Sequence, residues 1–188
     1  MRSRIVAPLA CSLLVAFGAV QIFAAVTESS TNVPLGIPDA GAVASTLNFS
    51  VNGTITDANL TVAITHTWND DLDVTLASPS IAAQLLLNDC GGSGDNVSAT
   101  VDQDAGGLAP CTAGATVSGS FQPTSGAGAG PAAASGNMNA FDGSMSGGVW
   151  TLNVTDDSAG CVGTLTAWSL TLDGAAPLPV ELMSFEIE

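Results

Sequence analysis

Positive charge is almost absent from this 188-residue sequence, which has two Lys or Arg residues against 17 Asp and Glu. Both basic residues, Arg2 and Arg4, lie within the first four positions. Nucleic-acid-binding proteins neutralise phosphates with Lys and Arg, so this composition excludes a nucleic-acid partner. An anionic membrane surface would repel the chain, whereas cations would be attracted to it.

Histidine and tyrosine are also scarce, with one His and no Tyr in the chain. A serine-protease triad and a typical zinc site both need histidine, and only His66 is available. His66 alternates with Ile64 and Trp68 on one face of an expected strand. This favours a histidine at the edge of the core that fixes a turn by hydrogen bonding. No Gly-x-Ser-x-Gly nucleophile motif occurs in a strand–turn–helix context, so we expect no catalytic residues and no enzyme activity.

The two arginines precede an apolar run that ends in small residues. A basic start, an apolar middle and a small-residue end are typical of a secretory signal peptide. The run is also long enough for a membrane anchor, but Pro8 and Gln21 interrupt it. We therefore expect residues 1–25 to be a signal peptide, cleaved after Ala24 or Ala25. The mature protein would be secreted, extracellular or at the cell surface, without stable membrane insertion.

Three cysteines follow the expected signal peptide: Cys90, Cys111 and Cys161. Export makes a disulfide plausible. Cys90 and Cys111 flank an Asp- and Gly-rich loop, and a disulfide between them would hold the two ends of that loop together. We favour this pairing, which leaves Cys161 as a buried thiol or an intermolecular partner.

From about residue 45 onwards the hydrophobic residues alternate with a period of two, and no segment shows a convincing helical period. Turn residues separate the alternating segments. We expect strands at residues 47–51, 60–68, 72–76, 81–87, 97–101, 115–118, 150–154 and 165–172. Short strands at this spacing predict an all-β sandwich or jelly roll.

The expected sandwich domain covers residues 26–174, a typical length for one domain. Its first part, residues 26–45, is polar and contains Pro, so we expect an entry segment without strands. Residues 124–139 consist almost wholly of small residues and predict a long loop. Residues 175–188 form a C-terminal tail, which is either a linker of the kind found after secreted bacterial domains or an additional edge strand.

Several segments, in the same order, resemble the motifs of the P domain (Homo B domain) of subtilisin/kexin-like proprotein convertases. The family motifs are H-T…D-L…L-x-S-P, G-x-x-x-P, F-x-G, G-x-W-x-L-x-V-x-D and G-x-L-x-x-W-x-L. They resemble His66–Pro79, Gly119–Pro123, Phe141–Gly143, Gly148–Asp156 and Gly163–Leu170, within a match over roughly residues 35–173. The resemblance implies an all-β jelly-roll β-sandwich, P-domain-like and galactose-binding-like. One departure is Ser80-Ile81, where family members commonly have Gly-Thr.

In that family the P domain follows a subtilisin-like catalytic domain and stabilises it through an apolar face. Here the expected signal peptide leads directly into the P-like segment. The resemblance therefore implies a secreted, non-catalytic, proteolysis-associated module. It would bind or stabilise a separately encoded subtilisin-like serine endopeptidase, or another protein, through a hydrophobic patch on an acidic surface.

The alternative is an extracellular calcium-dependent ligand-binding or adhesive module, for which carbohydrate is one candidate ligand. A glycan site normally exposes an aromatic side chain beside polar loops. The strand pattern instead places Trp68, Trp150 and Trp168 on core faces, which counts against a glycan site.

Paired carboxylates in two expected turns suggest a metal site. Asp70 and Asp71 share one turn, and Asp156 and Asp157 share another. Calcium takes six to eight oxygen ligands, often from irregular loops, and close carboxylates are costly without a neutralising cation. We therefore expect Ca²⁺ as a candidate cofactor where these turns meet. The alternative is a set of solvated turns without a bound ion.

Overall fold

The computed structural model of this protein describes residues 23–126 and 131–177. Within these ranges the chain forms twelve strands and two short 3-10 helices. The strands are β1 Phe23–Ser29, β2 Leu35–Ile37, β3 Ala42–Phe49, β4 Asp57–Thr65, β5 Leu72–Ala77, β6 Gln84–Asn88, β7 Val97–Asp102, β8 Val117–Phe121, β9 Thr124–Gly126, β10 Pro131–Ala133, β11 Gly148–Asp156 and β12 Gly163–Pro177. The helices are η1 Asn69–Asp71 and η2 Met138–Phe141.

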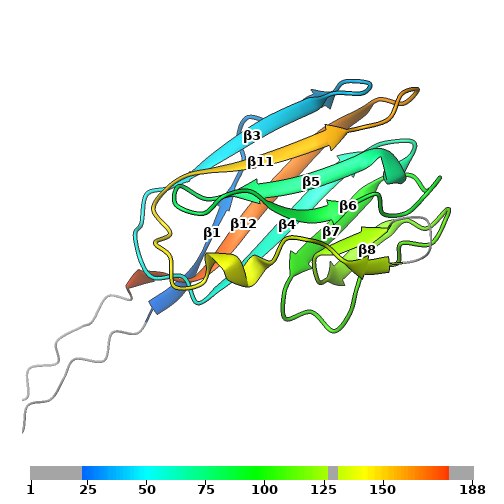
Figure 1. The fold of residues 1–188 in the computed structure, drawn as a ribbon. Helices are drawn as coiled ribbons and strands as arrows, with labels where there is room; N and C mark the ends of the chain where they lie inside the picture. Colours follow the sequence, from blue (N-terminus) through cyan, green and yellow to red (C-terminus); the bar gives the residue numbers. More distant parts are fainter. Residues whose placement is uncertain (1–22, 127–130, 178–188) are drawn as a thin grey trace, which may run out of the picture.

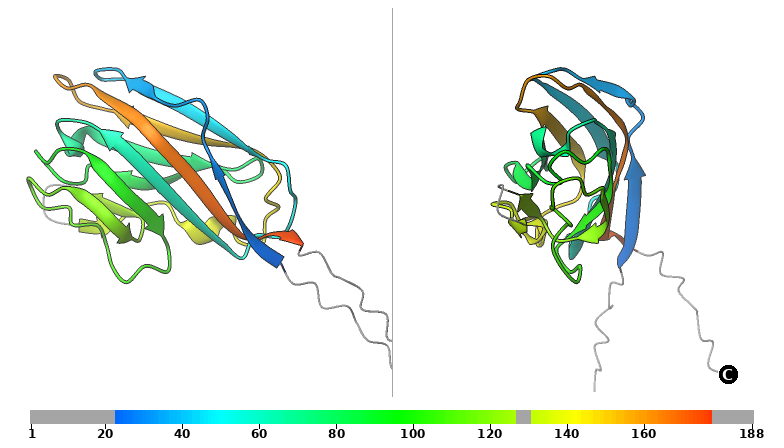
Figure 2. Two further views of the ribbon diagram at one scale, coloured as in Figure 1. Left: turned by 180° about the vertical axis from the view of Figure 1, so that it is seen from behind. Right: turned by 90° about the vertical axis from the view of Figure 1, so that its right-hand side faces the viewer.

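The strands form two sheets that face each other as a sandwich (Figures 1 and 2). The first sheet has the order β1-β12-β4-β7-β8, with β2 also paired to β12. The second has the order β10-β9-β6-β5-β11-β3. Pairing is antiparallel except between β7 and β8 and between β6 and β9. The all-β jelly-roll sandwich expected from the sequence is therefore confirmed.

The core lies between the two sheets and follows the period-two pattern. Along β4 and β11, alternate side chains point inward and are fully buried, while their neighbours face outward. Trp150 of β11 lies at one end of this core, in contact with Phe49 and Phe141 at ring-centroid distances of 6.1 and 5.0 Å. Its indole Nε1 donates a hydrogen bond to the Ser146 carbonyl oxygen at 2.9 Å, which satisfies its only polar group.

The middle strands fall where the sequence predicts them, whereas the N-terminal ones were missed. β5 and β7 each extend only one residue beyond the predictions of 72–76 and 97–101. The expected entry segment, 26–45, instead contains most of β1, all of β2 and the start of β3. The expected loop at 124–139 contains β9, β10 and the start of η2. β2, β9 and β10 have three residues each, which is too few to show a hydrophobic alternation.

The two ends of the described sandwich lie side by side. β1 and β12 are antiparallel, and Phe23 is paired with Pro177. The register shifts between Ala24 and Val26, and regular pairing continues from Val26 to Ser29. β12 thus extends past residue 174, while the rest of the expected tail, 178–188, lies outside the described residues, as do residues 1–22 of the expected signal peptide. Across the described segments, no helix is long and apolar enough to cross a membrane.

Candidate functional site

A buried histidine fixes the turn that follows β4. His66 is 2% exposed, and its Nε2 lies 3.2 Å from Oδ2 of Asp156, whose side chain is also fully buried. Its Nδ1 lies 2.7 Å from the Trp68 carbonyl oxygen. The turn-fixing role expected for His66 is confirmed, and the ring connects the end of β4 to the end of β11.

Trp68 is placed differently from the sequence prediction. The alternation along residues 60–68 predicts a core-facing Trp68, but β4 ends at Thr65 and the Trp68 side chain is 45% exposed. The backbone N–H of His66 donates to Oδ1 of Asn96 rather than continuing the ladder. The chain therefore leaves the sheet before Trp68, and the period of two no longer applies.

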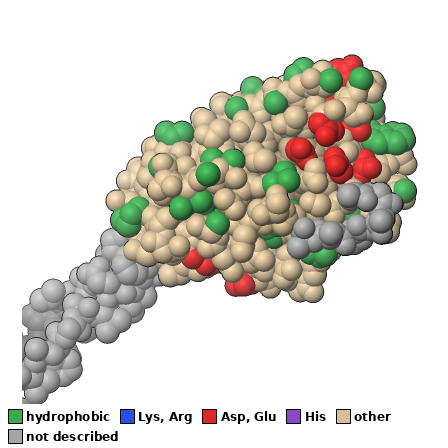
Figure 3. Space-filling view, viewed as in Figure 1, with side chains coloured by type: hydrophobic (Ala, Val, Ile, Leu, Met, Phe, Trp, Pro, Cys, Tyr) green, Lys and Arg blue, Asp and Glu red, His purple; other side chains and the backbone are tan. Residues whose placement is uncertain are grey.

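The two Asp-bearing turns meet at this end of the sandwich. The backbone N–H of Asp157 donates to the Asp71 carbonyl oxygen at 2.9 Å. Asp73 and Asp89 contribute to the electrostatics of the same region. We call this group the acidic end, and Figure 3 shows a concentration of Asp and Glu there. It consists of Asp70, Asp71, Asp73, Asp89, Asp156 and Asp157.

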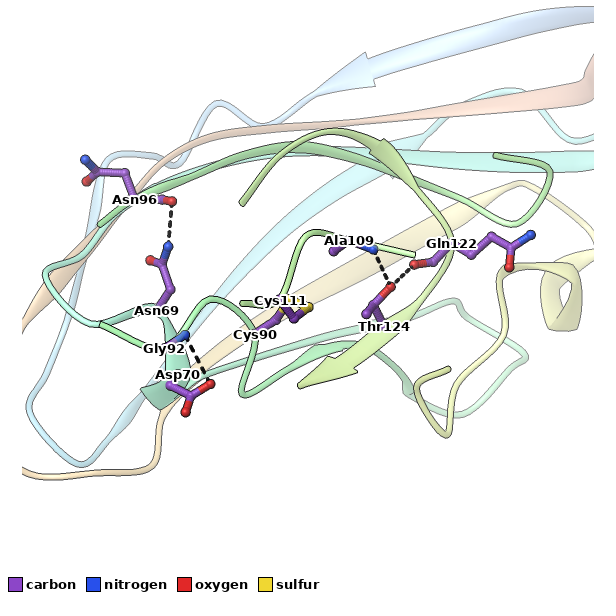
Figure 4. Close-up of a disulfide and its surroundings, with 9 residues drawn as sticks. All are labelled: Asn69, Asp70, Cys90, Gly92, Asn96, Ala109, Cys111, Gln122 and Thr124. Carbon is purple, nitrogen blue, oxygen red and sulfur yellow. Dashed lines mark hydrogen bonds between the residues drawn. A yellow bond between two sulfur atoms is a disulfide. The ribbon is translucent and has the colours of Figure 1, made fainter. Parts of the chain in front are cut away.

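A disulfide anchors the loop that borders the acidic end (Figure 4). Cys90 and Cys111, the pair favoured from the sequence, are joined across a Cα–Cα distance of 4.6 Å. The adjoining Gly92 N–H donates to Oδ1 of Asp70 at 3.3 Å, and the Asp70 N–H donates to the Gly92 carbonyl oxygen at 3.1 Å. Cys161 is half-buried and unpaired among the described residues.

Crowding of these carboxylates raises the pKa of two of them. Burial raises the pKa of Asp71, and the nearby Asp156 carboxylate raises it further. Burial raises the pKa of Asp89 to about 6, with additional contributions from Asp157, Asp73 and Asp70. Within the described ranges no Lys or Arg is present to offset this repulsion. The acidic end therefore stores unfavourable electrostatic energy at neutral pH.

The four expected calcium ligands are brought to one end but differ in environment. Asp156 faces His66, Asp71 is 8% exposed, Asp70 is half-buried, and Asp157 is exposed. In the described part of the chain, no three His, Cys, Asp or Glu residues form a group that could hold a metal ion. Calcium binding therefore stays a prediction. The sequence did not indicate Asp89 as a neighbour of these turns, because this proximity depends on the pairing of β5 with β6. Asp73 lies two residues after Asp71 in the chain.

An open cleft of about 270 Å³ lies on the same end of the sandwich. Most of the lining residues are polar, and Val162 adds an apolar side chain that is 63% exposed. Trp68 is not part of the lining, although it directly follows Thr67. The lining residues are Thr65, His66, Thr67, Asp95, Asn96, Val162, Gly163 and Thr164.

Comparison with known proteins identifies the family of this sandwich. The sequence profile of the proprotein convertase P-domain matches residues 55–172, which span β4 to most of β12. The chain belongs to the proprotein convertase P-domain family. In proprotein convertases the P domain by itself is a non-catalytic module.

One solved structure shows the same fold at low sequence identity, and a second is less similar. The serine protease of Aeromonas sobria, in its complex with the chaperone, has a TM-score of 0.53 and 18% identity, over 85% of this chain. The structure described as the Aeromonas sobria serine protease has a TM-score of 0.49 and 15% identity, over 84% of this chain. The match covers 28% of each protease chain. Among curated proteins, none matches the sequence.

Proposed function

We propose that this protein is a secreted, non-catalytic P-domain module that binds and stabilises another protein. The partner class we favour is a separately encoded subtilisin-like serine endopeptidase. The observation that carries this proposal is the P-domain match at residues 55–172, which covers most of the sandwich. The chain also spans only 28% of the Aeromonas sobria protease to which it is similar.

The position of the single histidine supports a non-catalytic role. A serine-type triad needs a histidine that takes a proton from a nucleophile. The His66 ring is buried and its two nitrogens face Trp68 and Asp156. It is therefore already engaged in holding two strand ends together.

The surface provides an uncharged area on which a partner could dock. The outward residues of β3 and β11 are Ala, Thr, Asn and Val, and Val149 is 54% exposed among them. Figure 3 shows this face with scattered hydrophobic side chains, away from the acidic end. These hydrophobic side chains are scattered, so the hydrophobic patch expected for a P-like module stays a prediction.

Purification of the secreted protein with its partner tests this function. We expect affinity-tagged chain to co-purify in a 1:1 complex with a subtilisin-like protease from the producing organism's culture fluid. The chain should also lengthen the half-life of that protease at elevated temperature, and Val149→Asp should weaken both effects. Ser120→Asp, on the opposite sheet, is the matched control. Hydrolysis of casein by the purified chain, abolished by His66→Ala, would contradict a non-catalytic role.

Export is part of the same proposal and has its own measurement. Regular pairing of β1 with β12 begins at Val26, so cleavage after Ala24 or Ala25 would preserve this part of the sheet. We expect mass spectrometry of the secreted protein to show an N-terminus at Ala25 or Val26. A mature protein that retains Arg2 and Arg4 would exclude cleavage at this site.

A calcium-dependent ligand-binding or adhesive module is the second candidate function. The exposed Trp68, next to the polar cleft at Thr67, favours it because an exposed indole can stack on a ligand. Glycan-array binding with calcium, lost with EDTA and in Trp68→Ala, is the expected result for this function. Binding that is indifferent to Trp68→Ala would exclude this site.

A further inference from the structure

We propose that this protein pairs with a second copy of itself through the free edge of β3, in antiparallel orientation. The proposal goes beyond the proposed function and does not depend on which partner that function involves. It concerns the free backbone edge of the second sheet.

Among the described residues, five strands lie at the edges of the two sheets, and four of them have features that oppose pairing with another chain. β2 has only three residues and contains Gly36. β1 carries Glu28 and would start at Ala25 or Val26 after the proposed cleavage, which shortens it. β8 has five residues and Gly119 at φ +95°. β10 has three residues and begins with Pro131. Bulges, charges, Pro and short length are the usual protections of an edge strand.

β3 lacks all of these protections. It runs for eight residues from Ala42 to Phe49, without a charged residue, Gly or Pro. Its eight pairs with β11 are continuous, without a register shift. On its other side, the described residues provide no strand and no backbone hydrogen-bond partner. In Figure 1, β3 lies along the outer margin of the second sheet. Such a long, regular and uncharged edge is a template for pairing with another strand.

The charge distribution favours a second copy in antiparallel orientation. The acidic end adjoins the start of β3, because the Asp156 N–H donates to the Gly41 carbonyl oxygen at 2.8 Å. At the far end of β3, Phe49 is paired with Gly148, and Asn48 is paired with Val149, whose side chain is exposed. Antiparallel pairing would place the acidic end of each copy beside the uncharged end of the other. The two acidic ends would be separated by about 24 Å along the strands, well beyond the Debye length of about 8 Å at physiological salt.

A two-fold axis near the middle of β3 would make the contact self-complementary. The free backbone N–H and C=O groups of each β3 would form hydrogen bonds with those of the other β3. The outward side chains of β3 are small or uncharged and would lie side by side across the contact: Ala42, Ala44, Thr46 and Asn48. The outer face of the second sheet would then continue across both copies. The outward face of β3 and β11, proposed above as the docking surface for a protein partner, would stay accessible. The dimer would carry two such faces side by side.

Sedimentation equilibrium on the mature protein, from about 10 to 300 µM, tests the pairing. We expect a reversible monomer–dimer equilibrium in which higher sodium chloride favours the dimer, because the net acidic charge of each copy is screened. Thr46→Asp places a charge next to the two-fold axis and should weaken dimerisation at least tenfold. Ser120→Asp makes the same change on the edge strand β8, where the residue is also exposed, and should leave dimerisation unchanged.

Spin labels distinguish the antiparallel arrangement from other contacts. Ala42→Cys and Thr46→Cys, each combined with Cys161→Ser, would carry the labels. Antiparallel pairing predicts Ala42 positions about 24 Å apart along the strands and much closer Thr46 positions. Equal distances at both sites would overturn the orientation. A monomer at every concentration and salt level would overturn the pairing, as would a dimer that responds equally to Thr46→Asp and Ser120→Asp.

Discussion

Asp89→Asn should stabilise this protein at pH 8 but not at pH 4. Asp89 lies in the acidic end, and burial together with Asp157, Asp73 and Asp70 raises its pKa from 3.8 to about 6. The folded protein therefore binds this proton more tightly than the unfolded chain does. Ionisation of Asp89 destabilises the fold above about pH 6, and this penalty disappears as the pH falls towards 4.

The size of the effect follows from the change in pKa. A rise from 3.8 to about 6 corresponds to about 3 kcal/mol if it acts fully on stability. Asp89 keeps partial contact with water, so we reduce this value to about 1–2 kcal/mol. For a domain of this size, that corresponds to a rise in Tm of about 3–6 °C. Urea unfolding followed by tryptophan fluorescence at pH 8 and pH 4 gives the free energies of unfolding.

The pH dependence separates charge from backbone preference. Asp89 has a φ of +46°, a conformation that Asn tolerates well, so the variant could also gain stability from its backbone. A backbone gain would be equal at both pH values. Asp95→Asn, at an exposed position in the nearby loop, is the matched control and should change stability by less than about 0.5 kcal/mol. Equal gains for Asp89→Asn at pH 8 and pH 4, or no gain at pH 8, would refute the electrostatic reasoning.

Three further predictions concern the disulfide, the core and calcium. Replacing Cys90 and Cys111 by Ser should lower the free energy of unfolding by about 3 kcal/mol in urea titrations, because the disulfide closes a segment with a sequence separation of 21; a loss no larger than that of Cys161→Ser would contradict this. Trp150→Ala should lower the free energy of unfolding by about 3–5 kcal/mol in the same titrations, since the side chain is fully buried. A loss below about 1 kcal/mol would contradict this and show that neighbouring side chains repack into the cavity. Millimolar calcium chloride should raise Tm more than sodium chloride of equal ionic strength, and EDTA should reverse the gain. An equal shift with sodium chloride would contradict a specific calcium site, because screening of the repulsion between carboxylates would then explain it.

The sequence indicates the strands with a regular hydrophobic alternation and misses those without one. β5 alternates Leu72, Val74 and Leu76 inward and is predicted almost to the residue. β2 has only three residues and depends on its pairing with Gly163–Leu165 of β12. Such a strand has no local signal, because its stability comes from a partner more than one hundred residues away.

The candidate site also depends on contacts between residues distant in the chain, which the sequence does not show. Adjacent carboxylates in the sequence indicate Asp70, Asp71, Asp156 and Asp157 as residues of two turns. Their meeting at one end depends on the pairing of β11 with β5, which brings Asp156 opposite Leu72. Trp68 was predicted to face the core because nothing in its own segment shows that β4 ends at Thr65. That ending requires the contact between His66 and Asn96, which are 30 residues apart.

The antiparallel pairing of β1 with β12 has a mechanical consequence. In the mature protein the N-terminus would lie at Ala25 or Val26, near the corner of the sandwich where β12 ends. Tension applied between this N-terminus and the end of β12 would act across the hydrogen bonds of the pair and load them one after another. The hydrogen bonds between β1 and β12 would then break one at a time. This requires a much lower force than shearing the two strands along their length, which loads all of the hydrogen bonds together. The strand that closes one edge of the first sheet would therefore be the first to detach from a molecule under load.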